Sequence, residues 1–191
     1  MSGQQEPKSE GSGAPPSAPL HAGTLTETPV VYEHLFGEAA QRLSRLLGDL
    51  CVIAIRGDRP GSVGPVVVSH RSESTRRLVE AALASADLDP IGWPLARRAL
   101  RSGEPVLIDL SSGDLLERVN PALRPYVADH SVSSLLFLPV RARGRTIGLV
   151  GLAREGPERS YGADDQVVAQ AVVDQVAEWS PQVDPRGSER L

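Results

Sequence analysis

The chain has 191 residues, enough for one domain with a core of its own. Its net charge of −4 gives no overall attraction to nucleic acid or anionic membranes, so we predict neither as a partner. Its single cysteine, Cys51, excludes an intramolecular disulfide framework and a thiolate metal cluster. No run approaches the ~20 apolar residues of a membrane span, and the N-terminus lacks a signal-peptide core. These features predict a cytoplasmic protein.

The chain divides into a domain with a tail at each end. Residues 1–28 are mostly Gly, Ser, Pro, Gln and Glu, which bury too little surface to offset their ordering entropy. We predict a disordered tail there, acting either as a regulatory arm or as a plain solvated segment. The domain is expected over 29–180, with a flexible tail over 181–191. The abundance of Ala, Arg and Gly with almost no Lys is typical of GC-rich bacterial genomes.

Hydrophobic periodicity predicts the elements in chain order. They are a helix over 30–47, strands over 51–55 and 66–69 separated by a Gly/Pro-rich loop, a helix ending near residue 84, a short helix over 95–101, a strand over 106–110, broken helix and loop over 111–129, two strands over 135–140 and 147–153, and a last helix over 164–179. Gly103 is a suitable left-handed cap for the short helix. This order predicts an α+β fold with helices packed on one sheet.

The two strands over 135–140 and 147–153 are the centre of this scheme. Both are continuous apolar runs, which indicates that both faces are covered. Gly144 supplies the positive φ that a hairpin turn needs. Pro139 indicates a strand end, a bulge or a sheet edge. Gly148 and Gly151 allow close approach of another backbone, a helix or a ligand.

The second half of the chain resembles a GAF domain, a small-molecule-sensing relative of the PAS fold. The resemblance is carried by residues 100–109 (LRSGEPVLID), 134–140 (SLLFLPV), 144–152 (GRTIGLVGL) and 161–165 (YGADD). It implies a central antiparallel sheet of five to six strands with the first and last helices on one face. Short helices and loops would then roof a ligand cavity on the other face. It also implies a homodimer through the first and last helices.

The sequence departs from the chemically defined branches of that family. The asparagine–lysine–phenylalanine–aspartate–glutamate signature of cyclic-nucleotide-binding members is absent, and Cys51 lies outside the roof where bilin-binding members attach their pigment. The methionine sulfoxide reductases of this fold use several cysteines, and one is too few. No nucleophile and base are assembled, so we predict that the protein is not an enzyme. The tails have no room for an output domain, so we expect it to act in trans on a signalling partner.

Four residues are candidates for contact with a ligand of unknown identity. Trp93 and Tyr126 fall in the expected roof, where an aromatic ring either stacks on a flat ligand or fills the core. Asp109 ends a strand and either accepts a ligand hydrogen bond or caps the next helix. His130 lies where haem-binding members resembling this family carry their proximal histidine, and its alternative role is to cap a backbone group in a loop. No pair of histidines has zinc-ligand spacing.

Three hypotheses for function remain open on this basis. The first is a sensory module that binds a small molecule, and the second is a dimerisation scaffold with a filled cavity. The third is a haem-based redox or gas sensor that uses His130. Two arginine clusters, at 97–101 and 141–145, indicate either a site for a phosphate or acidic partner or a solvated edge that prevents aggregation.

Overall fold

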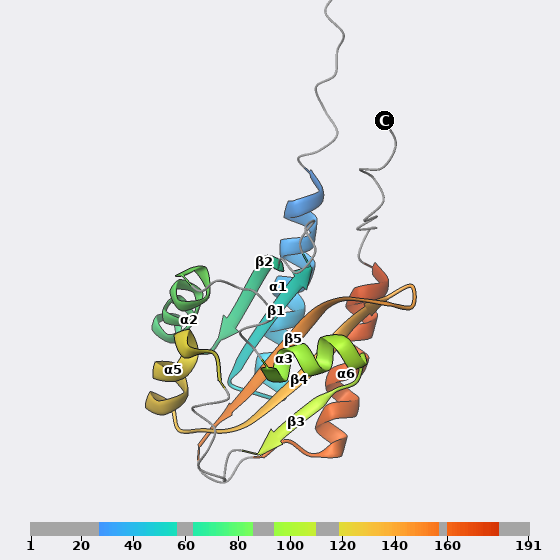
Figure 1. Ribbon diagram of the computed structural model, residues 1–191. Helices are drawn as coiled ribbons and strands as arrows, with labels where there is room; N and C mark the ends of the chain where they lie inside the picture. Colours follow the sequence, from blue (N-terminus) through green and yellow to red (C-terminus); the bar gives the residue numbers. More distant parts are fainter. Residues whose placement is uncertain (1–26, 57–62, 86–93, 110–118, 157–159, 180–191) are drawn as a thin grey trace, which may run out of the picture.

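The computed structural model describes residues 27–56, 63–85, 94–109, 119–156 and 160–179 (Figure 1). The first tail was predicted to run to residue 28, but α1 already begins at Glu27. The rest of that tail, the tail over 181–191, Trp93 and residues 111–118 of the predicted broken helix lie outside the described residues. The elements are α1 (Glu27–Leu46), β1 (Leu50–Arg56), β2 (Val63–His70), α2 (Glu73–Ser85), α3 (Pro94–Ser102), β3 (Val106–Asp109), the 3-10 turn η2 (Pro121–Leu123), α5 (Arg124–Asp129), β4 (Val132–Ala142), β5 (Arg145–Glu155) and α6 (Ala163–Trp179).

The strands form one antiparallel sheet in the order β2-β1-β5-β4-β3. The long hairpin of β4 and β5 lies in the middle of this order, as its apolar runs predict. The predicted α+β class and the five-stranded sheet are therefore confirmed.

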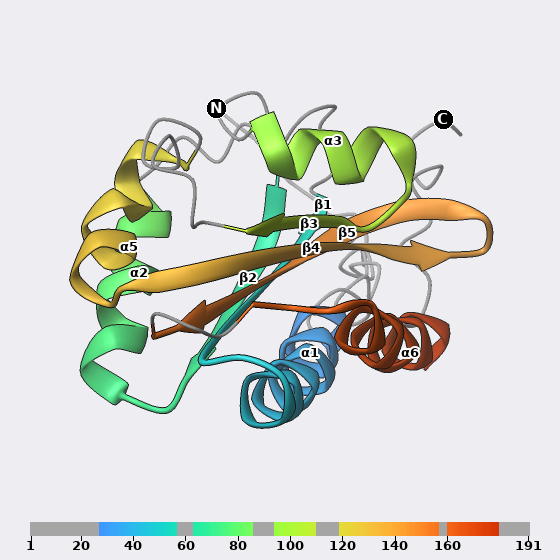
Figure 2. The same ribbon diagram turned by 90° about the horizontal axis from the view of Figure 1, so that it is seen from below.

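Helices cover both faces of the sheet, so the interior has two cores. α1 and α6 lie side by side on one face, whereas α3 lies across the other and α2 and α5 pack at one end (Figure 2). The core under α1 and α6 includes Leu43, Leu136, Leu138, Leu152 and Val173. The core on the α3 side includes Val52, Val79, Ala99, Tyr126 and Phe137. Neighbouring residues of one strand enter different cores, as the two-residue repeat of a strand requires.

Two prolines lie inside strands, and only one of them, Pro65, was predicted to lie in a loop. The predicted loop over 57–65 is too long, because β2 already begins at Val63 and includes Pro65. β2 is an edge strand, and its register with β1 shifts beside this proline, so the missing N–H leaves no ladder partner unpaired. Pro139 lies in β4 beyond Phe137, where the pairing with β3 has ended. That side of β4 is an edge, one of the three alternatives predicted for Pro139.

The hairpin is longer and its turn tighter than predicted. β4 continues to Ala142 and β5 begins at Arg145, which leaves only Arg143 and Gly144 in the turn. Both have positive φ, 52° and 73°, as a two-residue hairpin turn requires. Gly148 allows the backbone approach that the sequence predicts, because a Cβ there would lie 2.6 Å from the Ala54 carbonyl oxygen on β1.

Arg154 of β5 joins the end of α1 to the start of α6. Its Nε donates to the Leu47 carbonyl oxygen at 2.7 Å, and one terminal nitrogen donates to the Ser160 carbonyl oxygen at 2.8 Å. Both terminal nitrogens donate to the carboxylate of Asp165, at 2.9 and 3.1 Å. The guanidinium carbon also lies 4.4 Å from the centre of the Tyr161 ring. One side chain therefore holds three segments together.

Candidate ligand pocket

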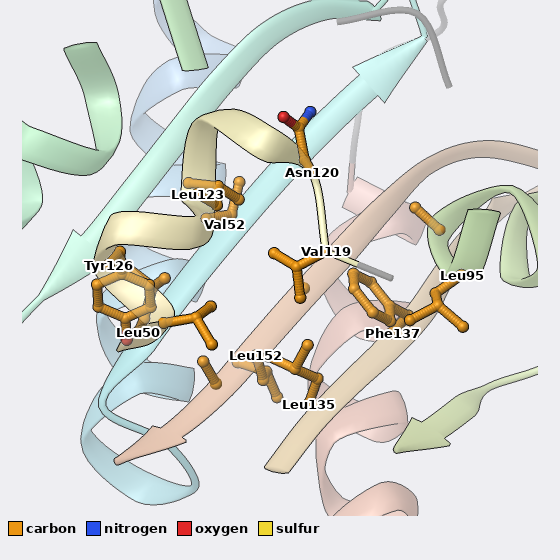
Figure 3. A pocket seen from close by; sticks show the side chains of 14 residues that line it. Leu50, Val52, Leu95, Val119, Asn120, Leu123, Tyr126, Leu135, Phe137 and Leu152 are labelled. Carbon is orange, nitrogen blue, oxygen red and sulfur yellow. The ribbon is translucent and has the colours of Figure 1, made fainter. Parts of the chain in front are cut away.

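A small pocket lies between the sheet and the segments on its α3 face. Its floor comes from β1, β4 and β5, and its cover from α3, η2 and α5 (Figure 3). The lining residues are Leu50, Val52, Leu95, Ala96, Val119, Asn120, Leu123, Tyr126, Val127, Leu135, Phe137, Gly151, Leu152 and Ala153. Its volume is about 50 Å³, more than one water needs but far below the 300–1,000 Å³ of typical ligand sites.

The polar groups of the lining residues point away from the pocket. The Asn120 amide is directed away from the other lining side chains (Figure 3), and its Oδ1 accepts from the backbone N–H of Ala122 at 2.9 Å. Tyr126 presents its ring, while its hydroxyl donates to Glu155 Oε1 at 3.2 Å. Burial and the neighbouring Glu155 carboxylate raise the pKa of Tyr126 well above its ordinary value, so the phenol stays protonated. The described walls therefore offer carbon to a ligand.

Of the three predicted site residues that the structure describes, one lies at this pocket. Tyr126 lines it, whereas Asp109 and His130 are not among the lining residues. Asp109 is exposed at the end of β3 and accepts from Ser160 Oγ at 3.2 Å. Trp93 lies outside the described residues. Gly151 is part of the floor, where a Cβ would lie 3.4 Å from the Phe137 ring, so its small size leaves space for both ring and pocket.

The described residues do not fit a haem bound through His130. Its Nε2 shares a hydrogen bond with Thr75 Oγ1, and its Nδ1 lies 3.1 Å from the Tyr126 carbonyl oxygen. Both ring nitrogens thus have protein partners, and the backbone N–H of His130 also donates to that carbonyl group. The nearby pocket is much too small for a porphyrin. The structure favours the capping role that the sequence analysis left open for this histidine.

A buried polar network adjoins the pocket behind Tyr126. His70 Nε2 lies 3.0 Å from Glu155 Oε1, and Arg71 bridges Glu155 and Asp49 at 3.0 Å each. The side chains of His70, Glu155 and Asp49 are 2%, 10% and 7% exposed. Because they are largely removed from water, these contacts supply the partners that buried polar groups need. His70 Nδ1 accepts from the Ser72 backbone N–H at 2.9 Å, which assigns the ring proton to Nε2, facing Glu155.

This network was not predicted from the sequence, because 85 positions separate His70 from Glu155. Each residue ends a strand, and the two strands are brought together by β1, which pairs with both of them and is a long-range feature of the sheet. The network joins β2, β5 and α5 at one end of the sheet. It therefore fixes the ring of Tyr126 against the pocket from behind.

The described residues contain no cluster of three or more His, Cys, Asp or Glu side chains able to hold a metal ion. Cys51 is fully buried in β1, and desolvation raises the pKa of its thiol well above the ordinary value. A protonated, inaccessible thiol is a poor nucleophile. Within the described part of the chain, no helix is both long and apolar enough to cross a bilayer.

Comparison with known proteins identifies the family. The model of the GAF domain matches residues 32–178. The chain belongs to the GAF domain family. GAF domains are generally small-molecule sensory or regulatory modules. No curated protein matches the sequence.

Solved structures share the fold of this GAF domain at low sequence identity. A GAF domain/HD domain protein from Geobacter sulfurreducens has a TM-score of 0.60 and 18% identity, covering 76% of this chain and 89% of that one. A type II free methionine-R-sulfoxide reductase from Thermoplasma acidophilum has a TM-score of 0.55 and 15% identity, covering 79% and 93%. The GAF3 domain of Slr1393 from Synechocystis, in its photoproduct state, also reaches 0.55 at 15% identity, covering 76% and 90%. One of these structural neighbours is thus an enzyme.

Proposed function

We propose that this GAF domain is a sensor that binds a small, uncharged and largely apolar molecule in the pocket under α3. The observation that carries the proposal is a pocket whose polar groups all point outward while its walls are carbon. Apolar cavities of this kind stay dry and bind apolar guests, since no water inside would find hydrogen-bond partners. The present volume of about 50 Å³ suits only a few heavy atoms, so a larger ligand requires α3 to move outward.

The experiment that tests this proposal is a thermal-melting screen of the full chain with small apolar probes, namely benzene, indole and short-chain alcohols. A ligand at about 100 times its Kd stabilises the native state by ~2.7 kcal/mol, which raises Tm by roughly 5 °C or more in a chain of this size. Ala96→Leu, which adds three carbons to a lining residue that is 3% exposed, should abolish the shift.

The matched control is Ala122→Leu, in η2 but not in the lining, which should keep the shift. The proposal fails if no probe raises the Tm of the wild type. It also fails if Ala96→Leu responds as the wild type does, because the probe then binds elsewhere.

We infer further that the domain acts in trans rather than by catalysis. The chain's single cysteine is buried and protonated, which argues against the thiol exchange that a sulfoxide reductase needs. The small-molecule signal would then pass to a separate protein. Incubation of the chain with free methionine sulfoxide and a thiol reductant, followed by an assay for methionine, tests this; turnover above a Cys51→Ala control would contradict it.

A homodimer through α1 and α6 is the second candidate role, and an exposed apolar group supports it. Leu46 of α1 is 59% exposed, and Val167 and Val168 of α6 are 69% and 47% exposed. Arg154 ties the end of α1 to the start of α6, so these side chains lie at the same end of the helix pair. Equilibrium sedimentation should show a dimer that Val167→Glu converts to a monomer, and a monomeric wild type would refute this role.

A further inference from the structure

Two arginine clusters that are far apart in the sequence meet in the structure. Arg98 and Arg101 are exposed on α3, and Arg141 and Arg143 are exposed at the β4–β5 turn. The link is Gly103, the cap of α3, because a Cβ there would lie 3.7 Å from Thr146 Oγ1 and 4.0 Å from Arg141 Nε. Figures 1 and 2 both show the C-terminal end of α3 on the same side as the turn. We call these four residues the arginine surface.

The arginine surface lacks acidic partners within the described part of the chain. None of its four side chains makes an ion pair or hydrogen bond there. Some arginines elsewhere do form ion pairs, as Arg76 with Glu73 and Glu80 and Arg154 with Asp165 show. Like charges gathered on one exposed face of a chain with net charge −4 create a local positive field that steers anionic partners.

Arg143 has a backbone conformation that other residue types adopt at lower energy. Its φ of 52° lies in the left-handed region, where Asn, Asp and Gly are preferred in a two-residue hairpin turn. A disfavoured backbone conformation of this kind is a reason to look for function at the residue that holds it. Here it places a guanidinium at the tip of the hairpin.

α3 connects the arginine surface to the pocket. Leu95 and Ala96 line the pocket from α3, while Arg98 and Arg101 are exposed on the same helix of nine residues. Any displacement of α3 by a ligand therefore moves Arg98 and Arg101 relative to the hairpin. We propose that the arginine surface is the docking site for an acidic segment of the protein on which this domain acts. The proposal rests on the sensor function above and identifies the surface through which the domain contacts its partner protein.

A protein segment fits this surface better than a membrane or a nucleic acid. The exposed large apolar side chains of the described residues are Leu46, Leu78, Leu107, Val167 and Val168, none of which is on α3 or in the turn, so the surface has no apolar anchor for a bilayer. A long polyanion would also meet the net negative charge of the rest of the chain. A short run of Asp and Glu contacts only the guanidinium groups, which bind carboxylates bidentately.

The experiment uses the full chain and a fluorescein-labelled peptide with eight glutamates, compared with the same peptide carrying glutamines. Fluorescence anisotropy at low salt should show binding of the glutamate peptide only. The triple variant Arg98→Gln, Arg101→Gln, Arg143→Gln should weaken it about tenfold or more, as expected for three lost charge pairs.

The matched control removes three exposed arginines elsewhere, Arg42→Gln, Arg56→Gln and Arg124→Gln, and should change the affinity less than about twofold because only the net charge is altered. Circular dichroism checks that both variants fold, and Arg101→Gln alone replaces the triple variant if that one does not.

Three results would overturn the inference: no binding of the glutamate peptide by the wild type, equal losses in the two triple variants, or tighter binding of single-stranded DNA or phosphatidylserine vesicles that the same three arginines support. Ala96→Leu separates this inference from the sensor proposal. With the pocket filled, the chain should still bind the peptide, so failure of the pocket test leaves this one intact. If both hold, a bound pocket probe should change the peptide affinity of the wild type but not of Ala96→Leu.

Discussion

Replacing Arg154 by methionine should destabilise the domain by about 2 to 4 kcal/mol. The Arg154 side chain is 13% exposed and that of its partner Asp165 is 24% exposed, so the pair is partly shielded from water. Methionine keeps much of the length but loses the bonds to Asp165 and to the carbonyl groups of Leu47 and Ser160. Hydrogen bonds to charged groups contribute ~1.5–3 kcal/mol each, and rehydration of the released carbonyls offsets part of the loss. The corresponding fall in Tm is roughly 5–15 °C.

Urea denaturation followed by circular dichroism measures this loss, with Arg145→Met as the control on the same strand. Arg145 is exposed, so its replacement should change the free energy of unfolding by less than about 0.5 kcal/mol. A double-mutant cycle with Asp165→Asn isolates the ion pair, and we expect a coupling of ~1–2 kcal/mol. Equal effects of Arg154→Met and Arg145→Met would refute the reasoning.

The same pair makes a pH prediction. Burial alone would raise the pKa of Asp165, but the Gly162 N–H and the Arg154 guanidinium outweigh it and lower that pKa below its ordinary 3.8. The folded state therefore binds the proton less readily than the unfolded state does. The resulting stability is fully present above the ordinary pKa and is lost as the pH falls through the lowered one. Arg154→Met should weaken this acid dependence.

Two comparisons between matched residues test the packing. Gly148→Ala should lower the free energy of unfolding by about 1–3 kcal/mol, because its Cβ would lie 2.6 Å from the Ala54 carbonyl oxygen. Gly151→Ala should lower it less, because its Cβ would meet only the edge of the Phe137 ring at 3.4 Å. Chemical denaturation of both variants ranks them, and the reverse order would contradict the register. Tyr161→Phe should be neutral or stabilising, because the buried Tyr161 hydroxyl has no hydrogen-bond partner among the described residues. Tyr126→Phe removes a bond to a buried carboxylate and should cost ~1–2 kcal/mol, so equal melting temperatures for the two phenylalanine variants would contradict the assigned bonding.

Local sequence signals predicted the helices and strands, whereas features that depend on residues distant in the sequence were not predicted. The helical period over 30–47 and the apolar runs around the hairpin turn follow from burial, which each segment encodes in its own residues. The extension of β2 through Pro65 did not follow, because only sheet topology makes that strand an edge.

The candidate site was predicted less well for the same reason. Tyr126 lines the pocket from the segment expected to form the roof, and its contact with a ligand stays a prediction. His130 is not among the lining residues and contacts Thr75, 55 positions away. Whether a polar side chain faces a ligand or a neighbour depends on tertiary packing, which periodicity does not reveal. The carbon walls of the pocket come from β1, α3, α5 and the hairpin, so no single segment indicates them.

A continuous sheet that separates two cores lets the two sides of this domain change independently. Apart from Leu152, which belongs to the core under α1 and α6 and also lines the pocket, the side chains around the pocket differ from those beneath α1 and α6, and effects at separate sites tend to add. Selection can thus change the lining of the pocket under α3 while the packing beneath α1 and α6 stays as it is. A scaffold built in this way suits a family of small-molecule sensory and regulatory modules.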